Sequence, residues 1–237
     1  MKRILAVLMI AATLPAHSAA PAAPNITVDD AVLQVNLEVM QWDAWRRECS
    51  EVLPEYSVGI GTIYVTWLDA NRPAVLAMLA YAEHSKKPNV AYSVLTPGIG
   101  GGVLEDASSK SGMAPRDQCA ATFKKLKAGE FAIARSYPDM MPVLARYLAA
   151  HPLSAAAARA YDNPLGCMKA ALSNKVEFEQ AVPMCRCSWQ AMNSTFTAAE
   201  WKEYEAAAAS KSEDAAQSLP QWKRALPKLT ACAQASH

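Results

Sequence analysis

The sequence lacks the usual signatures of metal, hydrolase and nucleotide chemistry. It has four histidines, of which one is the terminal His237, and it contains neither His-Glu-x-x-His nor Cys-x-x-Cys. A zinc-type or histidine-rich metal site is therefore not expected. The Gly-x-Ser-x-Gly elbow of α/β hydrolases and the Gly-Lys-Ser or Gly-Lys-Thr phosphate loop are missing too. No catalytic set is apparent, so the sequence leans away from an enzyme, and no cofactor is expected.

Charge of one sign and long apolar runs are also scarce. The formal net charge is +1, and it becomes −1 when Lys2 and Arg3 are removed. Such a balance exerts no long-range attraction on phosphate backbones, so nucleic acid is not an expected partner. Beyond residue 20, no apolar stretch approaches the roughly 20 residues of a membrane-spanning helix. We therefore expect no membrane insertion.

The N-terminus has the pattern of an export signal. Lys2 and Arg3 precede an apolar run over residues 4–14, and small residues over 18–20 offer a cleavage position. The sequence thus predicts a signal peptide at residues 1–20, followed by a flexible leader at 21–26. After its removal the protein is expected in the periplasm or outside the cell.

Six cysteines follow the predicted signal, and in an oxidising compartment this even number predicts three disulfides. They are Cys49, Cys119, Cys167, Cys185, Cys187 and Cys232. Cys185 and Cys187 would point about 200 degrees apart on a helix, so they should take different partners. Cys49 and Cys119 are then left as a staple of the N-terminal half. Which of Cys185 and Cys187 takes Cys167, and which takes Cys232, stays open.

Helical periodicity dominates the rest of the chain. Thr27 with Asp30 resembles a capping box, and Val32, Val35 and Val39 follow on one stripe. For residues 56–68 we favour a helix, with a buried strand as the alternative, because Gly59, Gly61 and β-branched residues weaken the helical pattern. Residues 87–111 are predicted to be the longest loop. Pro164 and Pro183 are interpreted as first-turn residues of new helices.

The fold class predicted from these patterns is all-α. It is a disulfide-stapled helical bundle of about eight or nine helices, with two possible subdomains. The N-terminal helical subdomain is predicted to cover residues 27–151, and the C-terminal helical subdomain, with its Cys-x-Cys pair, covers 152–237.

The leading functional hypothesis is binding to another protein in the envelope or outside the cell, as an inhibitor, immunity factor or envelope accessory. Trp45 is the candidate partner contact, because aromatic residues are favoured at binding hot spots and charged residues flank it. An apolar-ligand carrier is a weaker possibility. The alternative of thiol redox or Cu(I) chemistry centres on Cys185 and Cys187. In that reading Pro183 and Arg186 would lower a thiol pKa, and methionines 168 and 184 would supply further soft ligands.

Overall fold

The computed structural model describes residues 26–85, 102–210 and 213–234, and every regular element in these ranges is a helix. The predicted all-α, disulfide-stapled fold is confirmed. The elements are α1 (Val28–Val52), the 3-10 helix η1 (Pro54–Tyr56), α2 (Ser57–Ala70), α3 (Arg72–Ser85), α4 (Val103–Ser111), α5 (Pro115–Lys127), α6 (Ile133–Ser136), α7 (Met140–Ala150), α8 (Ala155–Ser173), α9 (Phe178–Asn193), α10 (Ala198–Ala209), α11 (Glu213–Ser218) and α12 (Pro220–Gln234).

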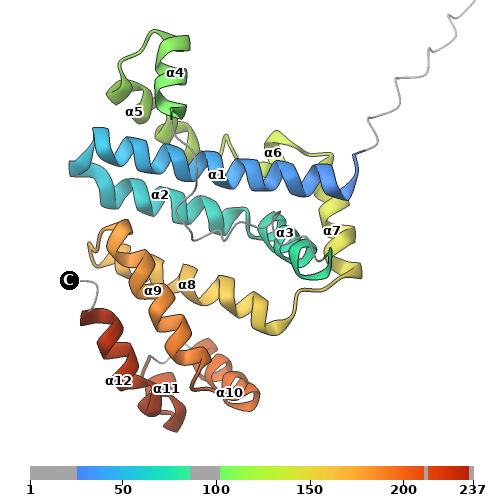
Figure 1. The fold of residues 1–237 in the computed structure, drawn as a ribbon, viewed down its shortest axis with the longest axis vertical. Coiled ribbons are helices and arrows are strands. Elements are labelled where there is room, and N and C mark those ends of the chain that lie inside the picture. The colour runs from blue at the N-terminus through green and yellow to red at the C-terminus, as the bar shows by residue number, and fades with distance from the viewer. Residues whose placement is uncertain (1–25, 86–101, 211–212, 235–237) are drawn as a thin grey trace, which may run out of the picture.

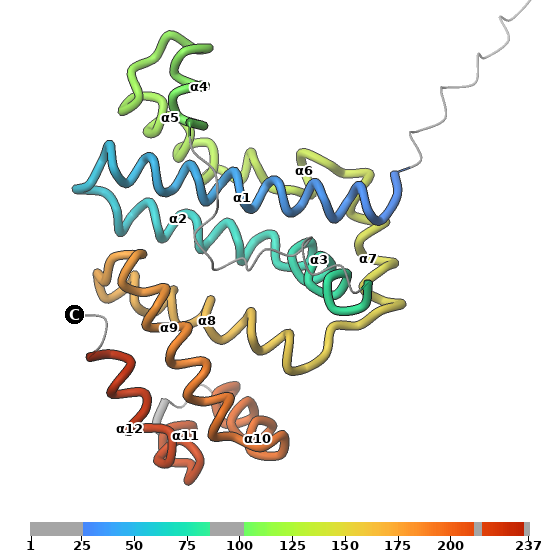
Figure 2. Tube along the Cα trace, in the orientation of Figure 1, coloured from blue at the N-terminus to red at the C-terminus, as the bar shows by residue number. Residues whose placement is uncertain are grey.

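The helices α1 and α2 run side by side through the middle of the molecule (Figure 1). On one side of this pair lie α4 and α5, and on the other side α8 and α9 pack against α2. The helices α3 and α7 pack on each other and on α1. The tube in Figure 2 shows the last three helices, α10 to α12, at the end of the molecule farthest from α4 and α5. The helix α2 is thus the element that several layers share.

The doubtful segment after Pro54 is a helix, as predicted. In α2, Ile60, Tyr64, Trp67 and Leu68 are all buried. Their spacing of three and four residues forms the stripe that faces the core, which outweighs the weak helix propensity of the glycines. The capping box at the start of α1 is present as well, with the Thr27 hydroxyl accepting the Asp30 N–H.

The interpretation of two prolines as helix starts is wrong. Pro164 lies inside α8 and Pro183 lies inside α9. A proline in a helix interior removes one backbone hydrogen bond. In α8 the Asn163 side chain donates to the Arg159 carbonyl at 3.2 Å, which supplies a bond to one of the carbonyls in that turn. Buried residues on both sides of each proline hold the helix continuous.

The prediction of one long loop over 87–111 is wrong in its last part, since Val103–Ser111 forms α4. Glu48 of α1 accepts the backbone N–H groups of Val103 at 3.4 Å and Leu104 at 2.8 Å. A carboxylate at this position caps the free N–H groups of the first turn. The cap comes from a distant helix, so no local pattern could reveal it. Residues 87–101 lie outside the described ranges.

Two clusters of buried side chains form the interior. The larger one reaches from Ala31 in α1 to Cys185 in α9, and the smaller one joins Met192, Phe196, Trp201 and Ala225. The larger cluster therefore runs across the boundary at residues 151 and 152. The division into subdomains over 27–151 and 152–237 stays a prediction.

The predicted signal peptide at residues 1–20 and most of the leader lie outside the described residues. Ile26, the last residue assigned to the leader, is partly buried and packs on the larger cluster.

Candidate functional site

Three disulfides join helices that are separated in sequence. Cys49–Cys119 ties α1 to α5, Cys167–Cys185 ties α8 to α9, and Cys187–Cys232 ties α9 to α12. The predicted staple in the N-terminal half is confirmed, and so is the prediction that Cys185 and Cys187 take different partners. The pairing that the sequence left open is also settled. All six cysteines are bonded, which fits an exported protein in an oxidising environment.

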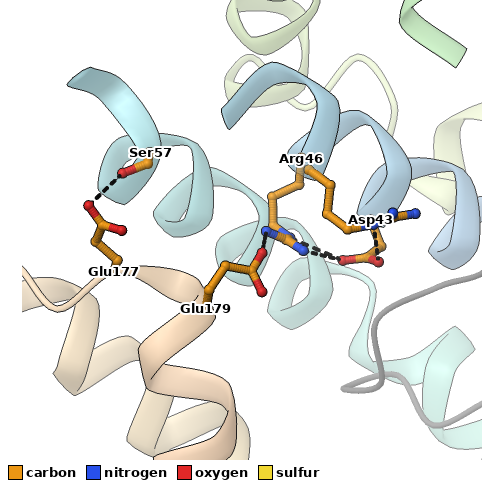
Figure 3. Close-up of polar contacts among 6 residues, drawn as sticks. Asp43, Arg46, Ser57, Glu177 and Glu179 are labelled. Atoms are coloured by element: carbon orange, nitrogen blue, oxygen red, sulfur yellow. Dashed lines mark hydrogen bonds and ion pairs between the residues drawn. The ribbon is translucent and has the colours of Figure 1, made fainter. Parts of the chain in front are cut away.

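A buried arginine connects α1 to α9 (Figure 3). The Arg46 side chain is 1% exposed; its Nε donates to Asp43 at 3.0 Å and its Nη1 donates to Glu179 at 2.7 Å. The guanidinium carbon also lies 3.9 Å from the centroid of the Phe178 ring. Arg47 contacts the second oxygen of Asp43 at 3.4 Å. Two cations thus face two carboxylates, and the contact between Arg46 and Glu179 links α1 to α9.

Beside this link, Tyr64 is buried with its hydroxyl unpaired among the described residues. Burial raises the pKa of Tyr64, and the nearby Asp43 carboxylate raises it further. The phenol therefore stays protonated at physiological pH, so it cannot serve as a general base.

A first groove lies between α1, α5 and the segment leading into α7, with a volume of about 530 Å³. Its polar centre is Glu38, which accepts the Trp42 indole N–H at 3.0 Å and the Tyr137 hydroxyl at 2.6 Å. The hydrogen bond to Glu38 raises the pKa of Tyr137 to about 12. Trp45 lines this groove but is only 5% exposed. Its assignment as a partner contact stays a prediction, and a partner would meet only a small part of the ring.

A second groove runs along the outer face of α2 and has a larger volume of about 810 Å³. We call it the α2 groove. Its floor is the exposed row Gly59, Thr62, Thr66 and Ala70, which recur three or four residues apart on one side of the helix. Tyr56, which is 60% exposed, stands at one end.

One wall of the α2 groove is the end of α5 and the turn that follows it. Hydrogen bonds from the last turn of α2 hold this wall in place. The Trp67 indole N–H donates to the Phe131 carbonyl at 2.9 Å, and the Asn71 side chain accepts the Ile133 N–H at 2.8 Å. Because both side chains are buried, these bonds are shielded from competing water. The wall is therefore fixed to the floor.

The opposite wall is the end of α8 and its turn into α9. It comes close to α2 because Gly61 has no side chain: a Cβ there would lie 3.0 Å from the Phe178 Cβ and 3.1 Å from a Leu172 methyl. The turn at Lys175 is closed by two backbone bonds, from Lys175 N to Leu172 O and from Val176 N to Ala171 O, both 3.0 Å. This is a Schellman motif, which places Lys175 at a left-handed φ of 66°.

The floor of the α2 groove offers a ligand little hydrogen bonding. The Thr62 hydroxyl donates to the Val58 carbonyl and the Thr66 hydroxyl donates to the Thr62 carbonyl, each at 2.8 Å. Both hydroxyl hydrogens are therefore already used within the helix. With Ile63, Leu126 and Leu172 on the sides, the groove is suited to apolar contact.

The part of the chain that the structure describes contains neither a cluster of metal-ligating side chains nor a membrane-spanning helix. No three histidine, cysteine, aspartate or glutamate side chains there gather as a metal site. No helix in the described ranges is long and apolar enough to cross a membrane.

The sequence did not identify the α2 groove. The small residues at 62, 66 and 70 are visible as a four-residue repeat, and that repeat is the signal that could have suggested a contact face. Comparison with known proteins adds no relative: no protein-family model matches the chain, and searches of curated proteins and of solved structures find no match either.

Proposed function

We propose that this chain is an exported helical protein that acts by binding another protein, of the inhibitor, immunity or envelope-accessory type. Its place of action is the periplasm or the outside of the cell, after removal of residues 1–20. The partner docks in the α2 groove.

The observation that carries this proposal is the open, mainly apolar α2 groove with its floor of exposed small side chains. Contact with another protein would remove the apolar side chains of this groove from water, which is favourable. The groove lies along a helix face with exposed residues, which suits a segment of another protein better than a small molecule enclosed on all sides.

The alternative of thiol redox or Cu(I) chemistry needs thiolates at Cys185 and Cys187. Cys185 is bonded to Cys167 and Cys187 is bonded to Cys232. Neither sulfur is therefore a free nucleophile or metal ligand while these bonds are intact. Protein binding does not depend on a free thiol, so it is the better supported of the two.

The test uses two matched substitutions, Thr62→Arg and Thr230→Arg. Both threonines are exposed, and each donates its hydroxyl to the carbonyl four residues earlier in its helix. Thr62 lies in the α2 groove, whereas Thr230 lies in α12. Because both sites are helical surface, both variants should fold, which circular dichroism can check.

Each purified protein is immobilised and exposed to envelope extract from the source cells. We expect the unaltered protein and Thr230→Arg to retain the same protein at near-equal molar amount, and Thr62→Arg to lose it. The proposal is contradicted if all three immobilised proteins retain that protein. It is also contradicted if none of the three retains any protein at near-equal molar amount.

A further inference from the structure

The rim of the α2 groove carries two lysines whose charges are not neutralised by ion pairs within the described residues. Lys127 comes from the end of α5 and Lys175 from the turn after α8, so they belong to opposite walls. Among the described residues that line the groove, Glu55 is the one acid, and it is paired with Arg116. A hydrogen bond from its own backbone lowers the pKa of Glu55 and Arg116 lowers it too, while burial acts in the opposite direction. The groove thus joins an apolar floor to a positive rim.

The floor favours an α-helix as its occupant. The row from Gly59 to Ala70 runs about 16 Å, or about three turns, along the axis of α2. A row of side chains spaced by four residues packs between the corresponding rows of a second helix. An extended peptide would instead bury backbone N–H and C=O groups against a helix that has no free backbone groups to pair with them. A helix brings its own backbone bonds already made.

At two positions on this groove, the residue present stabilises the local backbone less than another residue would. Gly59 is the third residue of α2, in its first turn, and glycine disfavours a helix relative to alanine by up to about 1 kcal/mol. A Cβ at Gly59 would meet nothing within 4 Å among the described residues, so their packing does not explain this glycine. Lys175 occupies a left-handed position at which glycine is the usual residue. Both exceptions lie on the surface that a partner would contact, where local stability is often given up for function.

We propose that the α2 groove binds an amphipathic α-helix of the partner, about three turns long. Its small and apolar residues face Gly59, Thr62 and Thr66, and its acidic residues approach Lys127 and Lys175. The inference rests on the proposed function and adds the chemistry of the partner segment. The missing Cβ at Gly59 lets the two helix backbones approach closely, and the lysines select an acidic helix over a basic one.

The test uses two synthetic helical peptides of about 18 residues, long enough for the three contacting turns and their ends. Both have alanine and leucine along one face; one carries glutamate beside that face, and the other carries lysine at the same positions. Their affinities for the disulfide-bonded protein are measured by titration calorimetry. We expect the glutamate peptide to bind at least about tenfold more tightly, with the difference shrinking as salt is added.

Substitutions separate the contribution of the lysine charges to peptide binding from that of the shape of the groove. The double variant Lys127→Gln with Lys175→Ala should lose the preference for the glutamate peptide, whereas Lys223→Gln, on exposed α12, should keep it. Thr62→Arg should weaken binding of the glutamate peptide because the arginine fills the floor. If both peptides bind equally well to the unaltered protein, or if neither binds, the inference is overturned.

The outcomes also separate this inference from the proposed function. If neither peptide binds but retention of a partner from extract is still abolished by Thr62→Arg, the helix inference fails and the proposed function stands. Dodecanoate, an anionic apolar probe, is titrated in parallel. Saturable binding of dodecanoate that Thr62→Arg abolishes, without binding of the glutamate peptide, would identify a lipid-type ligand and overturn the inference.

Discussion

The two faces of α2 carry small residues for different reasons. On the inner face, a Cβ at Gly61 would lie 3.0 Å from the Phe178 Cβ and 3.1 Å from a Leu172 methyl, so these neighbours would have to shift by a few tenths of an ångström. On the outer face, Gly59 has open space around it, and the neighbouring Thr62 and Thr66 are exposed. Packing among the residues that the structure describes thus accounts for the glycine on the inner face but not for the one on the outer face. The comparison indicates that one side of α2 builds the core and that the other side is exposed in the described part of the chain.

The largest loss of stability is expected for substitution of Arg46, whose guanidinium lies over the buried Tyr64 ring of α2. Arg46→Ala would remove the 3.0 Å ion pair of the buried Asp43 and leave in place its 3.4 Å contact with Arg47. Removing one partner of a buried pair costs about 3–5 kcal/mol, and because Arg47 stays we expect about 3 kcal/mol, measured as the free energy of unfolding in urea. The control is Lys110→Ala, whose ion pair with Asp106 is highly exposed and should matter by less than about 0.5 kcal/mol. Equal losses of unfolding free energy in Arg46→Ala and Lys110→Ala would contradict the assignment of Arg46 as a buried link between α1 and α9.

A smaller but sharper contrast comes from the two glycines. Gly61→Ala should lower the free energy of unfolding by about 1–3 kcal/mol, because the new methyl group overlaps Phe178. Gly59→Ala should raise it by up to about 1 kcal/mol, because alanine is the better helix former and meets nothing. Urea unfolding of both variants is the measurement. A change of unfolding free energy with the same sign in both variants would remove the distinction between the two faces of α2.

In addition, Gly59→Ala should weaken binding of the glutamate peptide while it stabilises the fold.

The smallest expected effect concerns Lys175 at the edge of the outer face. Lys175→Gly should raise the free energy of unfolding by about 1 kcal/mol, since glycine adopts the left-handed φ of 66° without strain. Lys175→Ala keeps the Cβ and therefore should leave stability close to that of the unaltered protein. Both variants lose the charge, so both should bind the glutamate peptide more weakly, as calorimetry would show. A glycine variant that is no more stable than the alanine variant would argue against strain at this turn.

Local patterns predicted much of the fold. Trp42 continues the stripe of Val32, Val35 and Val39, and Cys49 follows Trp42 by seven residues on the same face, which predicts that it points inward. In the structure Cys49 is buried and bonded to Cys119. The capping box at Thr27 marks the start of α1 because the required groups are three residues apart in sequence. Such features depend on contacts within one or two turns, which is why a single sequence reveals them.

The errors arise where a distant residue decides the local structure. The first turn of α4 is capped by Glu48 of α1, a residue of another helix that lies 55 positions earlier in the sequence than Val103. Pro164 fails to end α8 because burial of Tyr161 and Leu165 on either side outweighs one lost backbone bond. The α2 groove was missed for the same reason, since its walls come from α5 and α8.

The sequence by itself determined the helical class, the inward position of Cys49 and the separation of Cys185 from Cys187, because helical periodicity alone dictates the side on which each residue lies. Only the tertiary structure decided that Cys185 bonds to Cys167, that Gly61 is covered while Gly59 is open, and that two lysines flank one groove. The physical reason is that periodicity assigns a residue to a face of its helix, whereas the packing of other helices decides which faces are covered.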